Sequence, residues 1–357
     1  MRYPENYEEA RRNFRTAARA AGARLVAYVH PDQVSPSGKP LEIDVAVLGP
    51  DRSRKAILSI SGTHGLEACS GSAAQTRFLE QKPSPPLGTS IVMVHCLNPF
   101  GLAWSSRANE DFVDLSRSFV PRGSAPSPNP YYADIHALLT PSIWSDDAQA
   151  RFSAALAQLM ANHGPQAALT GVTGGQYEFR DGLSYGGDGA TWSRQVLESV
   201  CDRWLGTTDK IAYLDFHSGF GAFAEAFFVC FHPRGSSERR RVETWWGRLN
   251  ANEDAFGIAA EPEWNGLIWD GLRNWILPNA SICGAVIEFG TYDLPKVAEA
   301  LMIDRWLRFG QSAEPNCSEL RARMIETFNP SSRTWRSRVT DKGSALHAAA
   351  LAGLGEW

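Results

Sequence analysis

The sequence has no CxxC pair, no excess of charge of one sign, and no apolar run of the ~18 residues that a membrane span needs. Its six cysteines are scattered, several of them inside apolar runs, which indicates buried, reduced thiols. The formal net charge of −4 lacks the basic excess that is typical of nucleic-acid-binding proteins. These absences predict a cytoplasmic protein whose partners include neither nucleic acid nor membrane.

Export signals, internal repeats and low-complexity linkers are lacking as well. Residues 1–22 indicate an amphipathic surface helix rather than a signal peptide. A GxSxG pattern occurs once, at 182–186, but it lies in a Gly-rich stretch and not directly after a strand-like apolar run, which argues against a serine hydrolase. With 43% hydrophobic and 21% charged residues among 357, the chain has the composition of a folded globular protein, and its length allows two domains or one large one.

The sequence is rich in apolar runs of strand length, which alternate with helical stretches. These runs lie at 41–49, 55–65, 89–101, 210–221, 226–233 and 282–293. Nearly continuous Val, Ile, Leu and Phe predict strands that are buried on both faces, and the intervening helices favour parallel connections. The expected fold class is therefore α/β: three layers, α/β/α, with a mostly parallel, mixed central sheet.

Polar side chains follow four of these runs, namely His64, Asn98, His217 and Glu288. In open α/β sheets, ligands bind outside the carboxyl ends of the strands. Segments that are distant in the sequence are therefore expected to contribute to one site.

His64 and Glu67 form an HxxE pair, and two ligands at i and i+3 can face the same metal ion. His217 would complete a His₂Glu set, which leaves an open coordination position for catalysis. Each residue also has a structural interpretation. Glu67 can cap a helix, His64 can be an ordinary loop residue, and His217 can be a hydrogen-bonded core histidine.

Glu288 ends a buried strand, where a carboxylate is costly unless it is paired, hydrogen-bonded or used in chemistry. Its predicted role is general base, and the alternative is a structural ion pair with an arginine. Arg107 and Arg117 offer two further functions, stabilisation of an oxyanion and capture of a substrate carboxylate. The alternative for this segment is a solvated charged loop.

Together these segments resemble the zinc carboxypeptidase superfamily, which includes carboxypeptidase A and the aspartoacylase–succinylglutamate desuccinylase branch. The matching motifs occur in the family's order and are His64-x-x-Glu67, Asn98-Pro99-Phe100-Gly101, Arg107, Asp114-Leu115-Ser116-Arg117, His217 and Glu288. The resemblance covers roughly residues 40–300. Within the superfamily the chain looks most like an uncharacterised bacterial branch with inserts such as Gly175-Gln176-Tyr177, Tyr185-Gly186-Gly187 and Trp192-Ser193.

The resemblance implies one zinc ion, Zn²⁺, bound by His64, Glu67 and His217. It makes Glu288 the general base and then the acid, and it gives Arg107 the role of polarising the scissile carbonyl. The same resemblance implies that Arg117 holds a terminal carboxylate. Asp114 would accept a hydrogen bond from a ligand histidine, most simply His64, and so fix its tautomer.

Two departures from the family pattern affect the expected substrate-binding residues. Ser116 stands where carboxypeptidases place an asparagine beside the carboxylate-binding arginine. No tyrosine matches the mobile substrate-capping residue, and Trp269 and Asn274 occupy that neighbourhood. Tyr177 or Tyr185 is a candidate to supply a phenol from the insert. The expected substrate-binding set is therefore Arg117, Ser116, Asn98, Tyr177 and Tyr185.

We therefore expect a single zinc-carboxypeptidase-like catalytic domain over residues 1–357, with an insert at about 120–200 near the site and a helical C-terminal extension at about 304–357. The expected activity is zinc-dependent hydrolysis of an amide bond next to a carboxylate-bearing group. The substrate would be a small peptide or an N-acyl amino acid, and the long insert favours the smaller one. The alternative is a non-catalytic metal- or ligand-binding protein that retains the fold.

Overall fold

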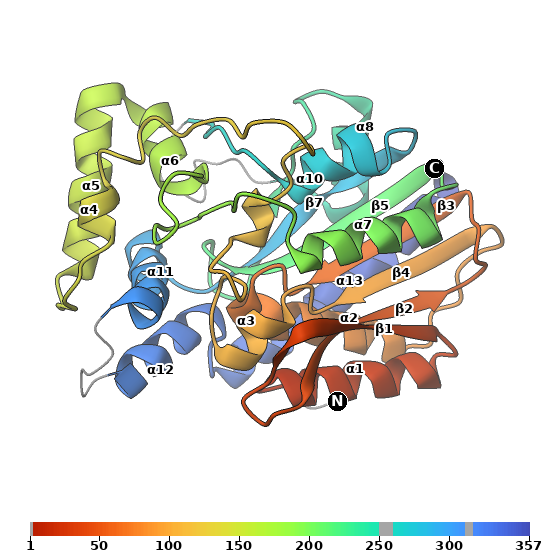
Figure 1. Cartoon of the computed structure of the whole chain (residues 1–357). Helices are drawn as coiled ribbons and strands as arrows, with labels where there is room; N and C mark the ends of the chain where they lie inside the picture. Colours follow the sequence, from red (N-terminus) through yellow and green to blue (C-terminus); the bar gives the residue numbers. More distant parts are fainter. Residues whose placement is uncertain (1–2, 250–259, 311–316) are drawn as a thin grey trace.

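The computed structural model describes residues 3–249, 260–310 and 317–357 (Figure 1). Its centre is a seven-stranded sheet with the strand order β1-β2-β4-β3-β5-β7-β6. The strands are β1 (Arg24–Val34), β2 (Pro40–Leu48), β3 (Lys55–Ser61), β4 (Thr89–His95), β5 (Lys210–Gly219), β6 (Ala226–Val229) and β7 (Ser281–Gly290). Each of the six apolar runs named from the sequence contains one of the strands β2 to β7. Strand β1 lies outside these runs.

The sheet is mixed, with its parallel pairs in the middle. Strands β4, β3, β5 and β7 are parallel to one another, whereas β1, β2 and β6 pair antiparallel. Parallel and antiparallel pairs are equally numerous, so the expectation of a mostly parallel sheet holds only for the centre. A short connection joins β1 to β2, and short connections of this kind produce antiparallel neighbours. The predicted fold class, α/β with helices on both faces, is confirmed.

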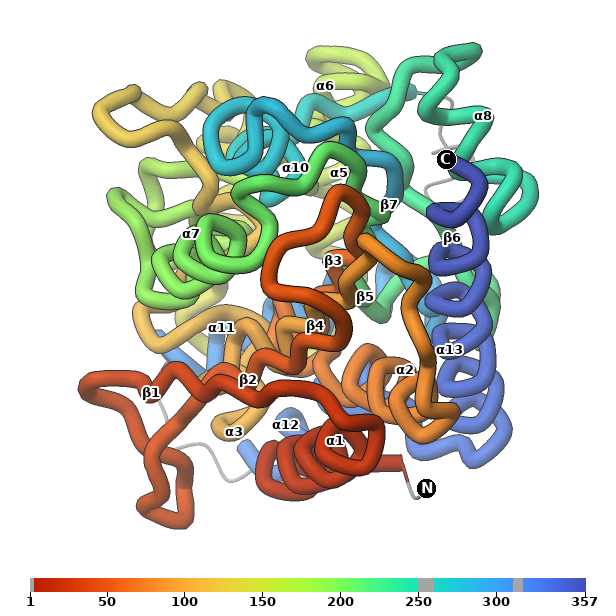
Figure 2. The backbone as a smooth tube through the Cα atoms, turned by 90° about the vertical axis from the view of Figure 1, so that its right-hand side faces the viewer, coloured from red at the N-terminus to blue at the C-terminus, as the bar shows by residue number. Residues whose placement is uncertain are grey.

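Helices cover both faces of the sheet, as Figure 2 shows. One face packs against α1 (Tyr7–Ala20), α2 (Ala68–Glu80), α8 (Ser237–Trp246) and α13 (Arg333–Glu356). The opposite face packs against α7 (Trp192–Leu205), α10 (Ile268–Gly271) and the turn η3 (Leu272–Ile276). None of the described helices has the length and apolar character needed to cross a membrane.

The remaining helices lie beside the sheet, at the left of Figure 1. They are α3 (Pro99–Trp104), α4 (His136–Leu139), α5 (Ala148–His163), α6 (Pro165–Thr173), α11 (Leu294–Phe309) and α12 (Cys317–Phe328). Apolar side chains of α4, α5 and α6 form a cluster with Ala298 and Met302 of α11. The segment 120–200 therefore packs on the helix that follows β7, except for its last part, α7, which lies on the sheet.

Alternation along β5 and β7 places the polar residues of interest on one face. Ala212, Leu214 and Phe216 of β5 belong to the core on the α2 and α13 side. Because successive side chains of a strand point to opposite faces, Asp215 and His217 lie on the other side. His217 is also the register partner of Glu288 on β7, so the two side chains are neighbours across parallel strands.

Strand β1 is not among the strands expected from the sequence. It contains Pro31, forms the edge of the sheet, and is mostly exposed or half-buried. Its pairing with β2 is irregular between Val29 and Val34. An edge strand tolerates proline and polar residues, so it leaves no continuous apolar run to detect.

Candidate metal centre

Three side chains converge at the carboxyl ends of β3 and β5. His64 follows β3, Glu67 ends the single turn η1 (Gly65–Glu67) that leads into α2, and His217 lies on β5. Nδ1 of His64 lies 3.1 Å from Nδ1 of His217 and 3.0 Å from Glu67 Oε1, and Nδ1 of His217 lies 3.2 Å from Glu67 Oε2. All three residues are buried, and one ligand atom of each lies within 4.8 Å of the others.

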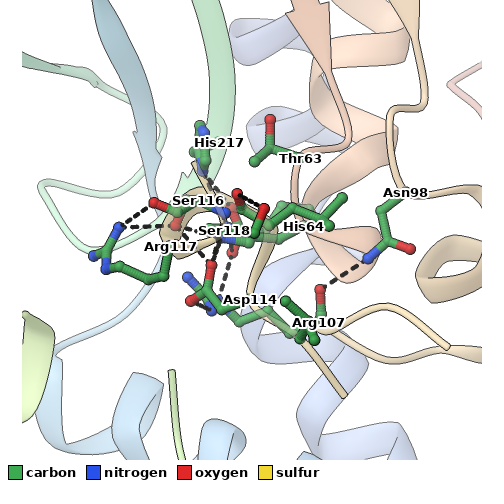
Figure 3. Close-up of polar contacts among 12 residues, drawn as sticks. Thr63, His64, Asn98, Arg107, Asp114, Ser116, Arg117, Ser118 and His217 are labelled. Carbon is green, nitrogen blue, oxygen red and sulfur yellow. Dashed lines mark hydrogen bonds and ion pairs between the residues drawn. The ribbon is translucent and has the colours of Figure 1, made fainter. Parts of the chain in front are cut away.

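The outer nitrogens of both histidines face carboxylates. Nε2 of His64 lies 3.1 Å from Asp114 Oδ1 (Figure 3). Nε2 of His217 lies 3.2 Å from Asp215 Oδ1, at ion-pair distance but not in hydrogen-bond geometry. Because a carboxylate only accepts hydrogen bonds, each of these carboxylates favours the tautomer with the proton on Nε2, which leaves Nδ1 to face inward as a possible ligand.

Two lone pairs and a carboxylate that face one another repel unless a positive charge lies between them. The pKa values of Glu67 and His217 reflect this preference for a positive charge among the three groups. Burial alone would raise the pKa of Glu67, but His64 and His217 hold it far below its usual range. Burial alone would lower the pKa of His217, but Asp215 and Glu67 raise it well above its usual value. The residues therefore fit a bound cation, and the donor set of two imidazoles and one carboxylate suits zinc.

Asp215 is a site residue that the sequence interpretation missed. Its Oδ1 accepts a hydrogen bond from Thr63 Oγ1 at 2.8 Å, and its Oδ2 accepts one from Tyr213 OH at 2.9 Å. These donors fix the carboxylate behind His217, as Arg107 and Ser116 fix Asp114 behind His64. The detectable signal is its position two residues before His217 in a strand, which places both side chains on the same face.

Glu288 lies beside this centre on β7. Its Oε1 is 4.0 Å from Nδ1 of His217, and its Oε2 is a buried atom with no hydrogen-bond partner among the described residues. Burial raises its pKa to about 8, an effect that His217 opposes and Glu67 reinforces. A cation held between the three ligands would favour the ionised form of Glu288.

Arg107 bridges two carboxylates of the centre. Its Nη1 donates to Asp114 Oδ2 at 2.5 Å, and its Nε donates to Glu67 Oε1 at 3.3 Å. Its main chain is also fixed: the N–H donates to Asp304 Oδ2 at 2.8 Å, and the carbonyl accepts from Gly65 N–H at 3.1 Å. Asp304, on α11, is a second positioning residue that the sequence interpretation missed.

Asn98 has a different place from the one expected. It is wholly buried, caps α3 by accepting a hydrogen bond from Gly101 N–H at 2.8 Å, and donates to the carbonyl of Arg107 at 3.2 Å. Figure 3 shows its amide turned to that carbonyl and away from the two histidines. Asn98 lines neither of the two cavities described below, and its side chain contacts the main chain of Gly101 and Arg107.

Arg117 and Ser116 line the same cavity as His64 and His217. Ser116 Oγ is 3.2 Å from His64 Nε2 and donates to Asp114 Oδ1 at 2.7 Å. The guanidinium of Arg117 donates to the carbonyls of Ser116 at 2.9 Å and Thr173 at 2.8 Å, and its buried Nε has no partner. Within the described residues, Arg117 makes no ion pair with a carboxylate, and burial lowers its pKa.

Tyr177 and Tyr185, the two tyrosines of the segment 120–200 expected to bind substrate, contact the main chain beside the site. Tyr177 OH donates to the carbonyl of Arg117 at 2.8 Å, and the carbonyl of Tyr185 accepts from Asp114 N–H at 2.7 Å. Neither tyrosine lines the cavities beside Glu288, whereas Trp269 does. The structure therefore places no tyrosine of this segment opposite the metal ligands.

Two cavities meet at Glu288, Arg107 and Arg117. The first, of about 110 Å³, includes His64, His217, Ser116 and an aromatic wall formed by Phe231, Trp264 and Trp269. The second, of about 100 Å³, includes Glu67 and has apolar walls from α5, α6 and α11. The candidate metal centre thus lies between two hollows of comparable size.

The comparisons with known proteins give a family and a set of similar folds. A family model described as "Protein of unknown function (DUF2817)" matches residues 3–342. No curated protein matches the sequence.

Three solved structures illustrate the fold similarity. A metallo-carboxypeptidase from Pseudomonas aeruginosa in complex with (2-guanidinoethylmercapto)succinic acid has a TM-score of 0.47 and 14% identity, over 99% of this chain and 70% of that one. A metallo-carboxypeptidase from Burkholderia cenocepacia has a TM-score of 0.46 and 11% identity, over 99% and 70%. A succinylglutamate desuccinylase from Chromobacterium violaceum has a TM-score of 0.39 and 13% identity, over 90% and 74%.

Loss of any one proposed ligand should abolish tight metal binding. We expect the purified chain to bind one Zn²⁺, and His64→Ala, Glu67→Ala and His217→Ala each to weaken binding by more than the 10- to 100-fold that is typical of a group behind a ligand. Titration against a competing chelator measures this. The control is His163→Ala, an exposed histidine on α5. Unchanged affinity in any of the three ligand variants would contradict the site.

Asp215→Asn tests the carboxylate behind His217. The amide keeps the shape of the side chain but removes the charge that holds the Nε2 proton, so Zn²⁺ affinity should fall by about 10- to 100-fold. Asp209→Asn, at an exposed position just before the same strand, should leave it unchanged. Equal affinities in the two variants, measured in the same chelator competition, would show that Asp215 has no role in holding the ligand.

Proposed function

We propose that this chain, which belongs to the family described as "Protein of unknown function (DUF2817)", is a zinc-dependent hydrolase that cleaves an amide bond next to a carboxylate. The observation that carries the proposal is the convergence of His64, Glu67 and His217 beside Glu288, a buried carboxylate with an oxygen that lacks a partner. A site built only for structure would satisfy that oxygen.

The ligand set fits catalysis because it contains three protein ligands, which leaves a coordination position open. A zinc ion held by them would lower the pKa of water toward ~7 and polarise a carbonyl oxygen. The protein groups around the ion then decide which bond is attacked and where the protons go.

Glu288 is the proposed general base. Its pKa of about 8 arises from burial, and a neighbouring cation would shift it toward the neutral range, where a proton can be both taken and returned. Glu288 accepts a proton from the attacking water and passes it to the amine that leaves. Proximity to His217 on the neighbouring strand keeps the carboxylate beside the proposed ligands.

Arg107 is the proposed oxyanion stabiliser. Asp114 and Glu67 occupy its Nη1 and Nε, and among the described residues no hydrogen bond uses Nη2, which leaves this nitrogen for a developing negative charge. Its main chain is held by Asp304, Asn98 and Gly65, so little reorganisation is needed when the charge appears.

Arg117, with Ser116, is the proposed carboxylate site. Its guanidinium is buried, donates only to neutral oxygens of the described residues, and lines both cavities. A substrate carboxylate would supply the missing counter-charge. The carboxylate therefore fixes the amide between the metal ligands and Glu288.

Glu288→Gln should retain Zn²⁺ affinity and lower kcat by about 10²–10⁴-fold, because the amide cannot take the proton. Amine release from a panel of N-acyl amino acids and short peptides measures the activity, and Glu356→Gln at the exposed C-terminal end is the control. Wild-type turnover retained by Glu288→Gln would remove the proposed base. A zinc-loaded wild type that cleaves neither class would favour the alternative, a metal-binding protein without catalysis.

Arg117→Gln should raise KM about 10- to 100-fold for substrates with a free carboxylate, because a hydrogen bond to a charged group contributes ~1.5–3 kcal/mol. Substrates whose carboxylate is converted to an amide should respond little, so the preference of the wild type for the free acid should shrink. Arg180→Gln, an exposed arginine, is the control. An unchanged ratio between acid and amide substrates would place the carboxylate elsewhere.

A further inference from the structure

The second cavity has four charged side chains at one end, and its other walls are mainly apolar, with the hydroxyl residues Thr173, Ser184 and Ser218 among them. Glu67, Glu288, Arg107 and Arg117 form the polar end. The apolar walls are provided mainly by Phe152, Val172, Leu294, Val297, Leu301 and Phe328. The hollow therefore begins at the reacting groups and runs into an apolar space.

These walls are fixed parts of the fold. Phe152 of α5 belongs to the cluster that joins the segment 120–200 to Ala298 and Met302 of α11. Gln149 Nε2 donates to Glu299 Oε2 at 2.7 Å, and Arg305 donates to the carbonyls of Asp181 at 2.8 Å and Pro141 at 3.2 Å. The two sides of the cavity are therefore tied together, and the space between them is part of the folded structure.

The two cavities separate the two halves of an amide substrate. Ser116 and Arg117 both line the first cavity, so the half that carries the carboxylate lies there. Arg107 and Glu288 line both cavities, so a carbonyl placed beside them leaves the second cavity open to the acyl half.

On the basis of the proposed function, we propose that the second cavity is an acyl site that binds an unbranched apolar chain, so the substrate is an N-acyl amino acid with a short to medium-length acyl chain. The volume of about 100 Å³ is several times the ~10–15 Å³ that a cavity needs to hold one water, so the cavity has room for a chain of several groups. An alkyl chain loses contact with water there at no polar cost.

A peptide fits the same space poorly. Its next residue would bring an N–H and a carbonyl into this mainly apolar cavity, where buried polar groups without partners are costly. Ser218, one of the two serines that line this cavity, already donates its hydroxyl to the carbonyl of Phe328 at 2.6 Å. The cavity therefore discriminates between substrates by the polarity of the acyl half.

The test uses the zinc-loaded full chain and one amino acid, phenylalanine, which suits the aromatic wall of the first cavity. Its N-acetyl, N-butyryl, N-hexanoyl, N-octanoyl and N-dodecanoyl derivatives are compared with peptides that end in phenylalanine. We expect kcat/KM to rise about fourfold for each methylene up to hexanoyl or octanoyl and then to fall. Peptides should be poorer substrates than the hexanoyl derivative.

Two variants that fill the cavity make the test specific. Val172→Phe, on α6, and Leu301→Trp, on α11, should move the best chain to a shorter length. Leu87→Phe, at a fully exposed position, is the control. Two positions are used so that a failure of one variant to fold still leaves the other.

The possible outcomes separate a failure of the acyl site from a failure of the proposed function. Turnover that is independent of chain length, a preference for peptides, or an unchanged best length in a folded cavity-filling variant would overturn the acyl site and leave the proposed hydrolase intact. No turnover of any derivative by the zinc-loaded chain would overturn the proposed function and this inference with it.

Discussion

The structure depends on a repulsion that the fold alone does not relieve. Two imidazole lone pairs and the carboxylate of Glu67 face one another within 3.2 Å at a buried position. Water cannot screen them there, so a positive charge must lie among them. Around this point lie four carboxyl groups, of Glu67, Asp114, Asp215 and Glu288, and Arg107 pairs with two of them, so a divalent cation suits the charge of the site.

The surrounding structure serves to hold this unfavourable arrangement in place. Asp114 and Asp215 orient the histidines from behind, and both are themselves held by several donors. Asn98 and Asp304 hold the main chain of Arg107 from α3 and α11. Close packing at Gly65 is part of the same framework, because a Cβ there would overlap the main chain of Gly101. The segment Asn98-Pro99-Phe100-Gly101 therefore supports the neighbouring turn η1, which carries Glu67.

Much of this organisation could be predicted from the sequence. Apolar runs identified the central strands, and polar residues at their ends identified the convergence of His64, His217 and Glu288, because burial and strand direction are local properties. Strand β1 was missed because an edge strand need not be apolar. Asp215 could have been predicted as well, because residues two apart on a strand share a face and Asp215 precedes His217 by two. The contacts of Asn98, Asp304, Tyr177 and Tyr185, in contrast, involve partners that lie farther away in the sequence. No periodicity encodes such partners, and they follow only from the packed structure.

The pairing of His217 with Glu288 has a consequence for how the chain folds. The two are register partners in a parallel pair that extends from Lys210 with Ser281 to Gly219 with Gly290. A slip of one residue would turn the affected side chains to the opposite face of the sheet. A slipped β5 would therefore lose its histidine from the ligand set and with it most of its affinity for the ion. An ion bound by this set would therefore stabilise only those molecules whose β5 and β7 have paired in the correct register.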